Sequence, residues 1–126
     1  MAISVKRVYE SPAANDGLRV LVDRLWPRGL SKDAARVDVW AKDLSPSNEL
    51  RKWYRHEAAR WPEFKRRYRA ELASNTDALD ALTAQARRRK VTLLFGSKEP
   101  HLNNAHALKE ILESRPAAPS SAPRRA

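Results

Sequence analysis

The sequence predicts one α/β domain of the three-layer, Rossmann-like class, with a small, mainly parallel sheet flanked by helices. Three observations lead to this prediction. Strand-like segments occur at residues 4–10, 19–26 and 90–97. Segments with a helical repeat of apolar side chains separate the second strand from the third and follow the third. The 126 residues fit one domain and can bury a core without covalent cross-links.

The strand segments differ in pattern. Residues 4–10 alternate apolar and polar side chains, whereas 19–26 (RVLVDRLW) and 90–97 (KVTLLFGS) are apolar enough for buried strands. Pro27 is expected to end the second strand because proline cannot donate to a ladder. Gly96 is expected to end the third.

Helix signals fill the remaining segments. Ser31 is expected to cap one or two helical turns before residues 37–40, and Ser45 to cap a helix with Pro46 at its first position. The other signals are an apolar stripe of Trp61, Phe64, Tyr68 and Leu72, a cap at Asn75 or Thr76, and a cap at Asn103 or Asn104.

The last residues have a different composition. Residues 115–126 contain three prolines and no large apolar side chain, so we expect a folded domain at 1–114 and a disordered tail at 115–126.

Composition excludes several classes of protein. The absence of cysteine excludes disulfides, thiol nucleophiles and thiolate metal sites. No apolar run approaches the length of a membrane span, and the charged start does not resemble a signal peptide, so a soluble cytoplasmic protein is expected. No histidine pair has metal-ligand spacing with a nearby carboxylate, and we expect no metal and no cofactor.

The net charge of +10 is concentrated in particular elements. Residues 51–69 hold eight basic and two acidic side chains, and residues 87–90 are all basic, whereas the first fifty residues hold eight basic and seven acidic ones. Such clusters attract nucleic acids and other polyanions without base recognition. Alternatively, they are the solvated faces of helices in a basic protein.

Polar segments follow two predicted strands, where ligands bind in α/β sheets. In the first, Arg24 and Arg28 are expected to bind phosphate or carboxylate, Trp26 to wall the pocket and Asp23 to orient Arg24. Arg24 is expected to be held by a carboxylate and Arg28 to be presented from a turn, with Gly29 allowing close approach of the backbone. Alternatively, Asp23, Asp38 or Asp43 pairs with Arg24, and Trp26 belongs to the core.

The second segment runs from Gly96 to Asn104. With three glycines in the whole chain, no glycine-rich phosphate loop can form, so Asn103, Asn104 and helix termini would assist the arginines. His56 and His101 are the candidate acid/base groups.

The chain resembles the YeaO-like branch of the bacterial DUF 488 domain-of-unknown-function family. The segments that carry the resemblance span most of residues 5–112: VKRVYE, DGLRVLVDRLWPRGLSK, DLSPSNELRKWY, WPEFKRRYRAEL, VTLLFGSKE and NNAHALKEIL. The resemblance implies a compact α/β domain and no established reaction.

The chain departs from the wider family where that family has a cysteine in the third strand and a later Cys-His-Arg signature. Phe95 and the residues Asn103 to Ala105 stand there instead, so a thiol-based mechanism could not operate. Within the branch a histidine often precedes the Asn pair, whereas Leu102 does so here and His101 lies one place earlier.

We therefore expect a domain that binds a nucleotide-like, phosphorylated or nucleic-acid anion through an arginine-containing pocket. The alternatives are a small enzyme on an anionic substrate with a histidine acid/base, and a nonenzymatic nucleic-acid-associated or protein-interaction module. The expected ligand-binding residues are Asp23, Arg24, Trp26, Arg28, His56, Lys98, His101, Asn103 and Asn104.

The composition of the tail generates one prediction. Deleting residues 115–126 is expected to leave the melting temperature unchanged, because the segment has no apolar side chain that could anchor it. Differential scanning calorimetry of the truncated and full-length chains checks this. A large drop in the melting temperature would show that the tail docks on the domain.

Overall fold

The computed structural model describes residues 1–115 and contains a four-stranded, all-parallel sheet in the order β1-β4-β2-β3. The strands are β1 (Ile3–Arg7), β2 (Leu18–Leu21), β3 (Val39–Trp40) and β4 (Val91–Phe95). Every residue of β4, one of the two inner strands, is buried, as its continuous apolar run predicts. The predicted α/β class with a small parallel sheet is confirmed.

Helices connect and follow the strands. They are α1 (Lys32–Ala35), α2 (Asn48–Tyr54), α3 (Trp61–Leu72), α4 (Thr76–Arg88) and α5 (Asn104–Ser114), together with short 3-10 helices at Ala14–Asp16, Lys42–Leu44 and Ala58–Arg60. No helix in the described residues is long and apolar enough to cross a membrane.

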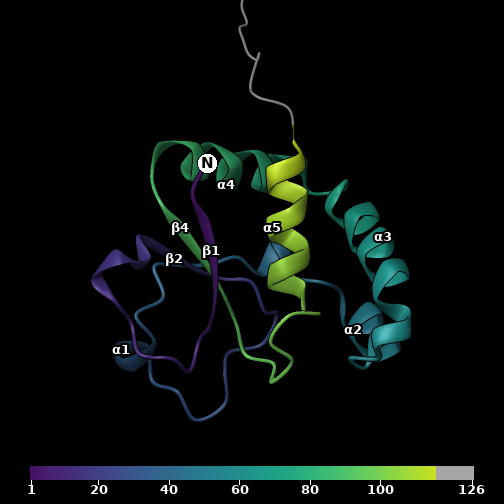
Figure 1. Cartoon of the computed structure of the whole chain (residues 1–126), viewed down its shortest axis with the longest axis horizontal. Helices are drawn as coiled ribbons and strands as arrows, with labels where there is room; N and C mark the ends of the chain where they lie inside the picture. Colours follow the sequence, from purple (N-terminus) through teal and green to yellow (C-terminus); the bar gives the residue numbers. More distant parts are fainter. Residues whose placement is uncertain (116–126) are drawn as a thin grey trace, which may run out of the picture.

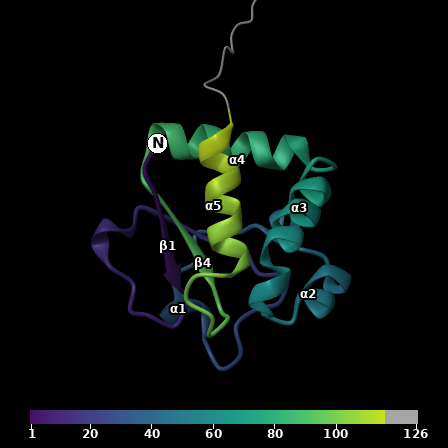
Figure 2. The same ribbon diagram turned by 45° about the vertical axis from the view of Figure 1, so that its right-hand side comes forward.

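The sheet has a layer on each face. On one face, Val20, Leu93 and Phe95 belong to a large apolar cluster with the buried side chains of α2 to α5. On the other face, Leu21 and Leu94 pack with Ala35 of α1 in a smaller cluster. Figures 1 and 2 show α5 beside the sheet, α2 and α3 beyond α5 on the same side of the sheet, and α4 across the end where the chain begins.

Two predicted boundaries were wrong. The second strand ends at Leu21, so Asp23 to Trp26 lie beyond the ladder, and proline is not what ends it. Ser47 rather than Ser45 caps α2, which begins at Asn48, so Pro46 precedes the helix; the Ser45 hydroxyl donates to the Ala41 carbonyl instead. The Ser47 hydroxyl accepts from the Leu50 amide and donates to Glu71, which ties the start of α2 to α3.

The other caps follow the sequence more closely. Ser31 caps α1, Asn75 occupies the N-cap position of α4, and Asn103 caps α5 by accepting from the His106 amide. Of the tail expected at residues 115–126, all but Arg115 lies outside the described residues. Arg115 forms an ion pair with Asp80 of α4.

An arginine held by a carboxylate does occur in β2, at Arg19. Its guanidinium is buried, donates to Asp16 at 2.6 Å, and also reaches the carbonyls of Ala35 and Arg36. Lys6 of β1 reaches the same carboxylate at 3.2 Å. This network joins β1, β2 and the end of α1.

The network generates a stability prediction. Arg19→Ala is expected to lower the free energy of unfolding by about 3–5 kcal/mol, because it leaves the buried Asp16 with only Lys6 as a cationic partner. Urea denaturation of the variant and the wild type measures the effect. A loss below about 1 kcal/mol would show that this ion pair contributes no more than a surface pair.

Candidate functional site

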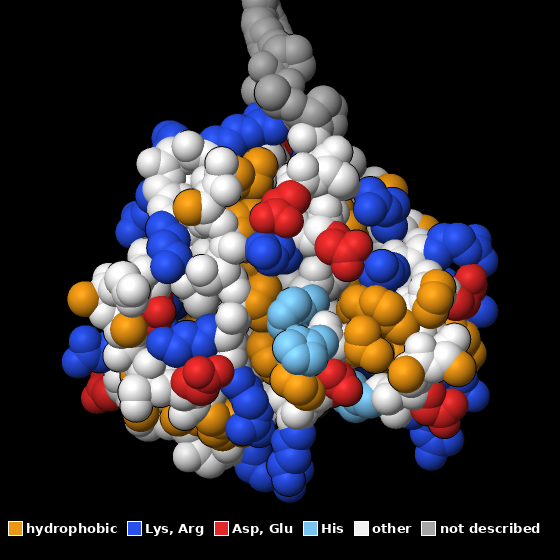
Figure 3. Space-filling view, in the orientation of Figure 1, with side chains coloured by type: hydrophobic (Ala, Val, Ile, Leu, Met, Phe, Trp, Pro, Cys, Tyr) orange, Lys and Arg blue, Asp and Glu red, His pale blue; other side chains and the backbone are white. Residues whose placement is uncertain are grey.

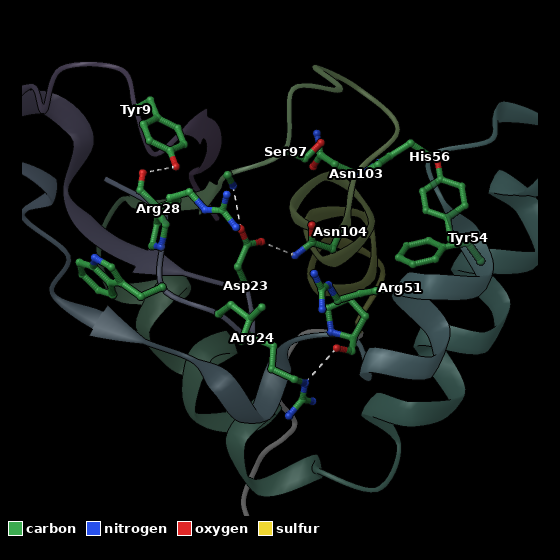
Figure 4. Close-up of a pocket in the computed structure, with 16 residues that line it drawn as sticks. Tyr9, Asp23, Arg24, Arg28, Arg51, Tyr54, His56, Ser97, Asn103 and Asn104 are labelled. Atoms are coloured by element: carbon green, nitrogen blue, oxygen red, sulfur yellow. Dashed lines mark hydrogen bonds between the residues drawn. The ribbon is translucent and has the colours of Figure 1, made fainter. Parts of the chain in front are cut away.

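A cavity of about 350 Å³ lies beyond the carboxyl ends of the parallel strands (Figure 4). One wall is the chain segment after β2, from Asp23 to Arg28, together with Tyr9. The opposite wall is formed by α2 and by His56, two residues after the end of α2. Gly96 follows β4, Asn104 begins α5, and both also line the cavity.

Asp23 is fixed by two neutral donors. The Gly96 amide donates to Oδ2 at 2.8 Å, and the Asn104 side-chain amide donates to Oδ1 at 3.1 Å. The same Asn104 nitrogen donates to the Val22 carbonyl at 2.7 Å. A Cβ atom on residue 96 would lie 3.1 Å from Oδ2, so glycine permits this close approach. Asp23 therefore does not orient Arg24, contrary to the expectation.

Burial is the largest influence on the Asp23 carboxyl and raises its pKa above the ordinary value. The hydrogen bonds from Asn104 and Gly96, and the charges of Arg51 and His56, act in the opposite direction. The balance is a carboxyl group held in a fixed position at the cavity, with a pKa that favours the protonated form more than in solvent.

Arg24 is held by backbone carbonyls. Its Nε donates to Pro46 and one terminal nitrogen donates to Ser45, both at 3.2 Å. The predicted carboxylate partner was wrong, because Arg24 lies past the end of β2 and its side chain meets the turn before α2. Its contacts fix that turn against the segment after β2, and Arg24 still lines the cavity.

Arg28 is exposed and projects from its turn toward the cavity (Figure 4). The Tyr9 hydroxyl donates to the Arg28 carbonyl at 2.8 Å, which anchors the backbone of the turn. Gly29 has φ of +75°, but apart from its own chain neighbours no atom lies within 4 Å of where its Cβ would be. Glycine is therefore favoured by the backbone conformation, and the expected close approach of the backbone to a ligand stays a prediction.

Trp26 combines both roles that were considered for it. Its indole N–H donates to the Leu30 carbonyl at 2.6 Å, and its ring packs edge-on against Trp40 with 5.3 Å between centroids. It also lines the cavity. The ring is thus part of the smaller core cluster and a wall of the site.

The α2 wall contains residues that were not singled out from the sequence. Arg51 and Tyr54 line the cavity, and the Tyr54 hydroxyl donates to the Leu102 carbonyl at 2.7 Å. Burial raises the pKa of Tyr54 to about 12. Arg55 and His56 follow with left-handed backbone, at φ of 50° and 56°, and this reversal brings the His56 side chain to the cavity.

The segment after β4 is tied down by its own polar groups. Glu99 accepts from the amides of His101 and Leu102, and the side-chain amide of Asn103 donates to the Glu99 carbonyl. The hydrogen bonds from the backbone amides of Leu102 and His101 lower the pKa of Glu99. Arg7 donates to the Ser97 carbonyl at 2.9 Å, which attaches the segment to β1.

The cavity brings together seven of the nine predicted site residues: Asp23, Arg24, Trp26, Arg28, His56, Asn103 and Asn104. Lys98 and His101 do not line it. Tyr9, Arg51, Tyr54 and Ser97 also line the cavity and were not predicted as site residues. Arg51 belongs to the basic cluster at 51–69 and was attributed to a general polyanion surface, so its charge was noticed but its position was not.

The basic cluster at 51–69 is partly neutralised within the protein. Arg66 and Arg67 both pair with Glu63, and Lys65 pairs with Glu110. The cluster at 87–90 ends α4 and precedes β4, at the opposite end of the sheet from the cavity. On most of the molecular face that Figure 3 shows, basic side chains are interspersed with acidic and other side chains.

Comparison with known proteins places the chain among bacterial relatives. A family model described as "Inactive DUF488-N3 subclade" matches residues 2–125. The uncharacterised protein Rv3073c of Mycobacterium tuberculosis is 42% identical over 113 residues, which cover 90% of this chain and 95% of the relative. The uncharacterised protein YeaO of Escherichia coli is 40% identical over 114 residues, which cover 90% of this chain and 99% of the relative. No solved structure matches significantly.

The two arginines after β2 are expected to respond differently to alanine. Arg24→Ala is expected to lower the free energy of unfolding by about 2 kcal/mol, because two backbone carbonyls lose a charged donor. Arg28→Ala is expected to change it by less than about 0.5 kcal/mol, since the side chain is exposed. Urea denaturation of both variants checks this, and the reverse order would contradict the assigned roles.

The raised pKa of Asp23 predicts a pH dependence. The folded protein holds this proton more tightly than the unfolded chain, so ionisation of Asp23 lowers the stability as the pH rises from about 3.8 through the raised pKa. The free energy of unfolding of the wild type should therefore fall over this pH range relative to that of Asp23→Asn. At higher pH the difference between the two proteins should stay constant. Unfolding free energies of both proteins at several pH values test this, and a difference that grows in favour of the wild type would contradict it.

Proposed function

Because the chain belongs to the DUF488 family, in its inactive DUF488-N3 subclade, we propose that its cavity is a binding site for a small anionic molecule. The anion is nucleotide-like or otherwise phosphorylated, and the arginines beside the cavity bind it. Binding without turnover agrees with the description of the subclade and with the lack of cysteine in the chain.

One observation carries this proposal. Arg24, Arg28 and Arg51 all line one cavity, and none of them forms an ion pair with a carboxylate of residues 1–115. Arg24 donates to two carbonyls and Arg51 to the neutral Asn48 side chain. Their positive charges are therefore available to a ligand. Guanidinium groups form charge-assisted, often bidentate hydrogen bonds with phosphate and carboxylate.

The size and lining of the cavity agree with a small ligand. A cavity of about 350 Å³ falls at the lower end of the range of about 300–1,000 Å³ that small-molecule sites occupy. Tyr54 and Phe64 give it an aromatic side, beside the polar groups of Asn104 and His56. Most of the lining residues are polar or charged, which suits a small anion held by charge-assisted hydrogen bonds.

A nucleic-acid surface is less well supported. Its cations would come from the clusters at 51–69 and 87–90, yet Arg66 and Arg67 share Glu63, and the second cluster lies at the other end of the sheet. Binding of nucleic acid through such clusters would fall steeply with salt and tolerate any base sequence.

The proposal is tested by a thermal-shift screen with orthophosphate, AMP and ADP, followed by calorimetric titration. A ligand that binds only the native state raises the melting temperature, and above the dissociation constant the stabilisation grows with the logarithm of the ligand concentration. Arg28→Ala and Arg51→Ala are each expected to weaken binding of the best ligand at least tenfold, because one charged hydrogen bond contributes about 1.5–3 kcal/mol.

Arg66→Ala is the matched control. It removes the same unit of charge from an exposed residue of α3 outside the cavity, so it should leave the affinity within about twofold. Equal weakening by all three variants would attribute the effect to net charge and contradict a specific site. Absence of any shift with all these anions would also contradict the proposal.

A further inference from the structure

We propose that the ligand of this cavity carries hydroxyl groups beside its anionic group, and that Asp23 accepts hydrogen bonds from those hydroxyls. The inference rests on the proposed function and deepens it, because it selects phosphorylated polyols or sugars from among small anions. Asp23 then discriminates between ligands, while the arginines supply most of the affinity.

The hydrogen bonds of Asp23 leave it able to accept more. Each carboxylate oxygen accepts one protein donor, from Gly96 at 2.8 Å and from Asn104 at 3.1 Å. An ionised carboxylate has about four acceptor positions, so further positions remain on the side that lines the cavity. No Lys, Arg or His of residues 1–115 forms an ion pair with it.

The two protein donors also keep Asp23 an acceptor. The backbone N–H of Gly96 and the side-chain NH2 of Asn104 can only donate to these oxygens. The Asn104 NH2 also donates to the Val22 carbonyl, so a flip of the side-chain amide would break both of its hydrogen bonds. A hydrogen-bond donor of the ligand can bind the carboxylate oxygens, whereas an acceptor of the ligand would be repelled by them.

The charges around Asp23 determine where each part of a ligand lies. Figure 4 places Arg28 on one side of Asp23, and Arg51 with His56 on the other. A phosphate that contacted Asp23 itself would be repelled, so the anionic group belongs at the arginines. The group that contacts Asp23 is then a neutral donor, because the flanking arginines disfavour an ammonium group.

The test compares two phosphates of the same charge and nearly the same size. Glycerol 3-phosphate and propyl phosphate differ only by two hydroxyl groups, and their dissociation constants are measured by calorimetry with the full chain. The wild type is expected to bind glycerol 3-phosphate about tenfold more tightly, as for one hydrogen bond to a charged acceptor.

Two variants separate the contributions. Asp23→Asn is expected to reduce the preference to within about twofold and to bind propyl phosphate at least as tightly as the wild type, because the repelling charge is gone. Arg28→Ala is expected to weaken both phosphates by the same factor. Circular dichroism of each variant establishes that it is folded.

The outcomes distinguish the inference from the function on which it rests. Equal affinity of the wild type for the two phosphates would overturn the role of Asp23 and leave anion binding intact, whether or not Asp23→Asn folds. A preference that survives in a folded Asp23→Asn variant would also overturn it. Failure of the wild type to bind either phosphate would overturn the inference and count against the proposed anion site as well.

Discussion

The hydrogen bonds that hold the Asp23 carboxylate determine the shape of the site. They join the chain after β2 to the chain after β4 and to the first turn of α5, because Gly96 and Asn104 donate to the same side chain. The bond from Asn104 to the Val22 carbonyl reinforces this junction. The cavity lies beside this junction: Asp23, Gly96 and Asn104 all line it, and the residues of α2 line it from the opposite side. Glycine at 96 favours this arrangement, because a Cβ atom there would lie 3.1 Å from Oδ2 and the carboxylate would have to move.

The arginines illustrate how position decides between structure and ligand binding. Arg19 lies within β2 and is buried against Asp16, so its charge is neutralised inside the fold. Arg24 lies just beyond the strand and is attached to two carbonyls of the turn before α2. Arg28 lies on an exposed turn and pairs with no carboxylate of the described residues. The further along the chain from β2 each of these arginines lies, the less its charge is neutralised by partners within the described residues.

The sequence predicted the class of fold and two of the segments that line the cavity, because both depend on local patterns. The apolar run of β4 and the stripe of α3 identify their elements directly, and the polar residues after two strands identify the carboxyl edge of the sheet. The partners within the site depend on three-dimensional contacts instead. Arg24 was assigned a carboxylate because β2 was expected to extend to Trp26, and the strand ends at Leu21.

Other elements also had no sufficient local signal. The two-residue strand β3 is too short to show a repeat, and its pairing with β2 defines it. Arg51 faces the cavity only because of where α2 packs against α3, and Lys52 and Arg55 nearby in sequence are as basic as it is. The left-handed backbone at Arg55 and His56 carries no glycine that would have marked it. These features follow from packing and not from local composition.

The most direct test of the account is a nuclear magnetic resonance titration of the ¹⁵N-labelled chain with AMP. If the cavity binds the anion, the backbone amide of Gly96, the side-chain amide of Asn104 and the indole N–H of Trp26 should shift together and saturate with one dissociation constant. The amides of residues 63–69 and 87–90 should shift little. Saturable shifts confined to those basic clusters, with the three cavity signals unchanged, would contradict an anion site at the carboxyl edge of the sheet.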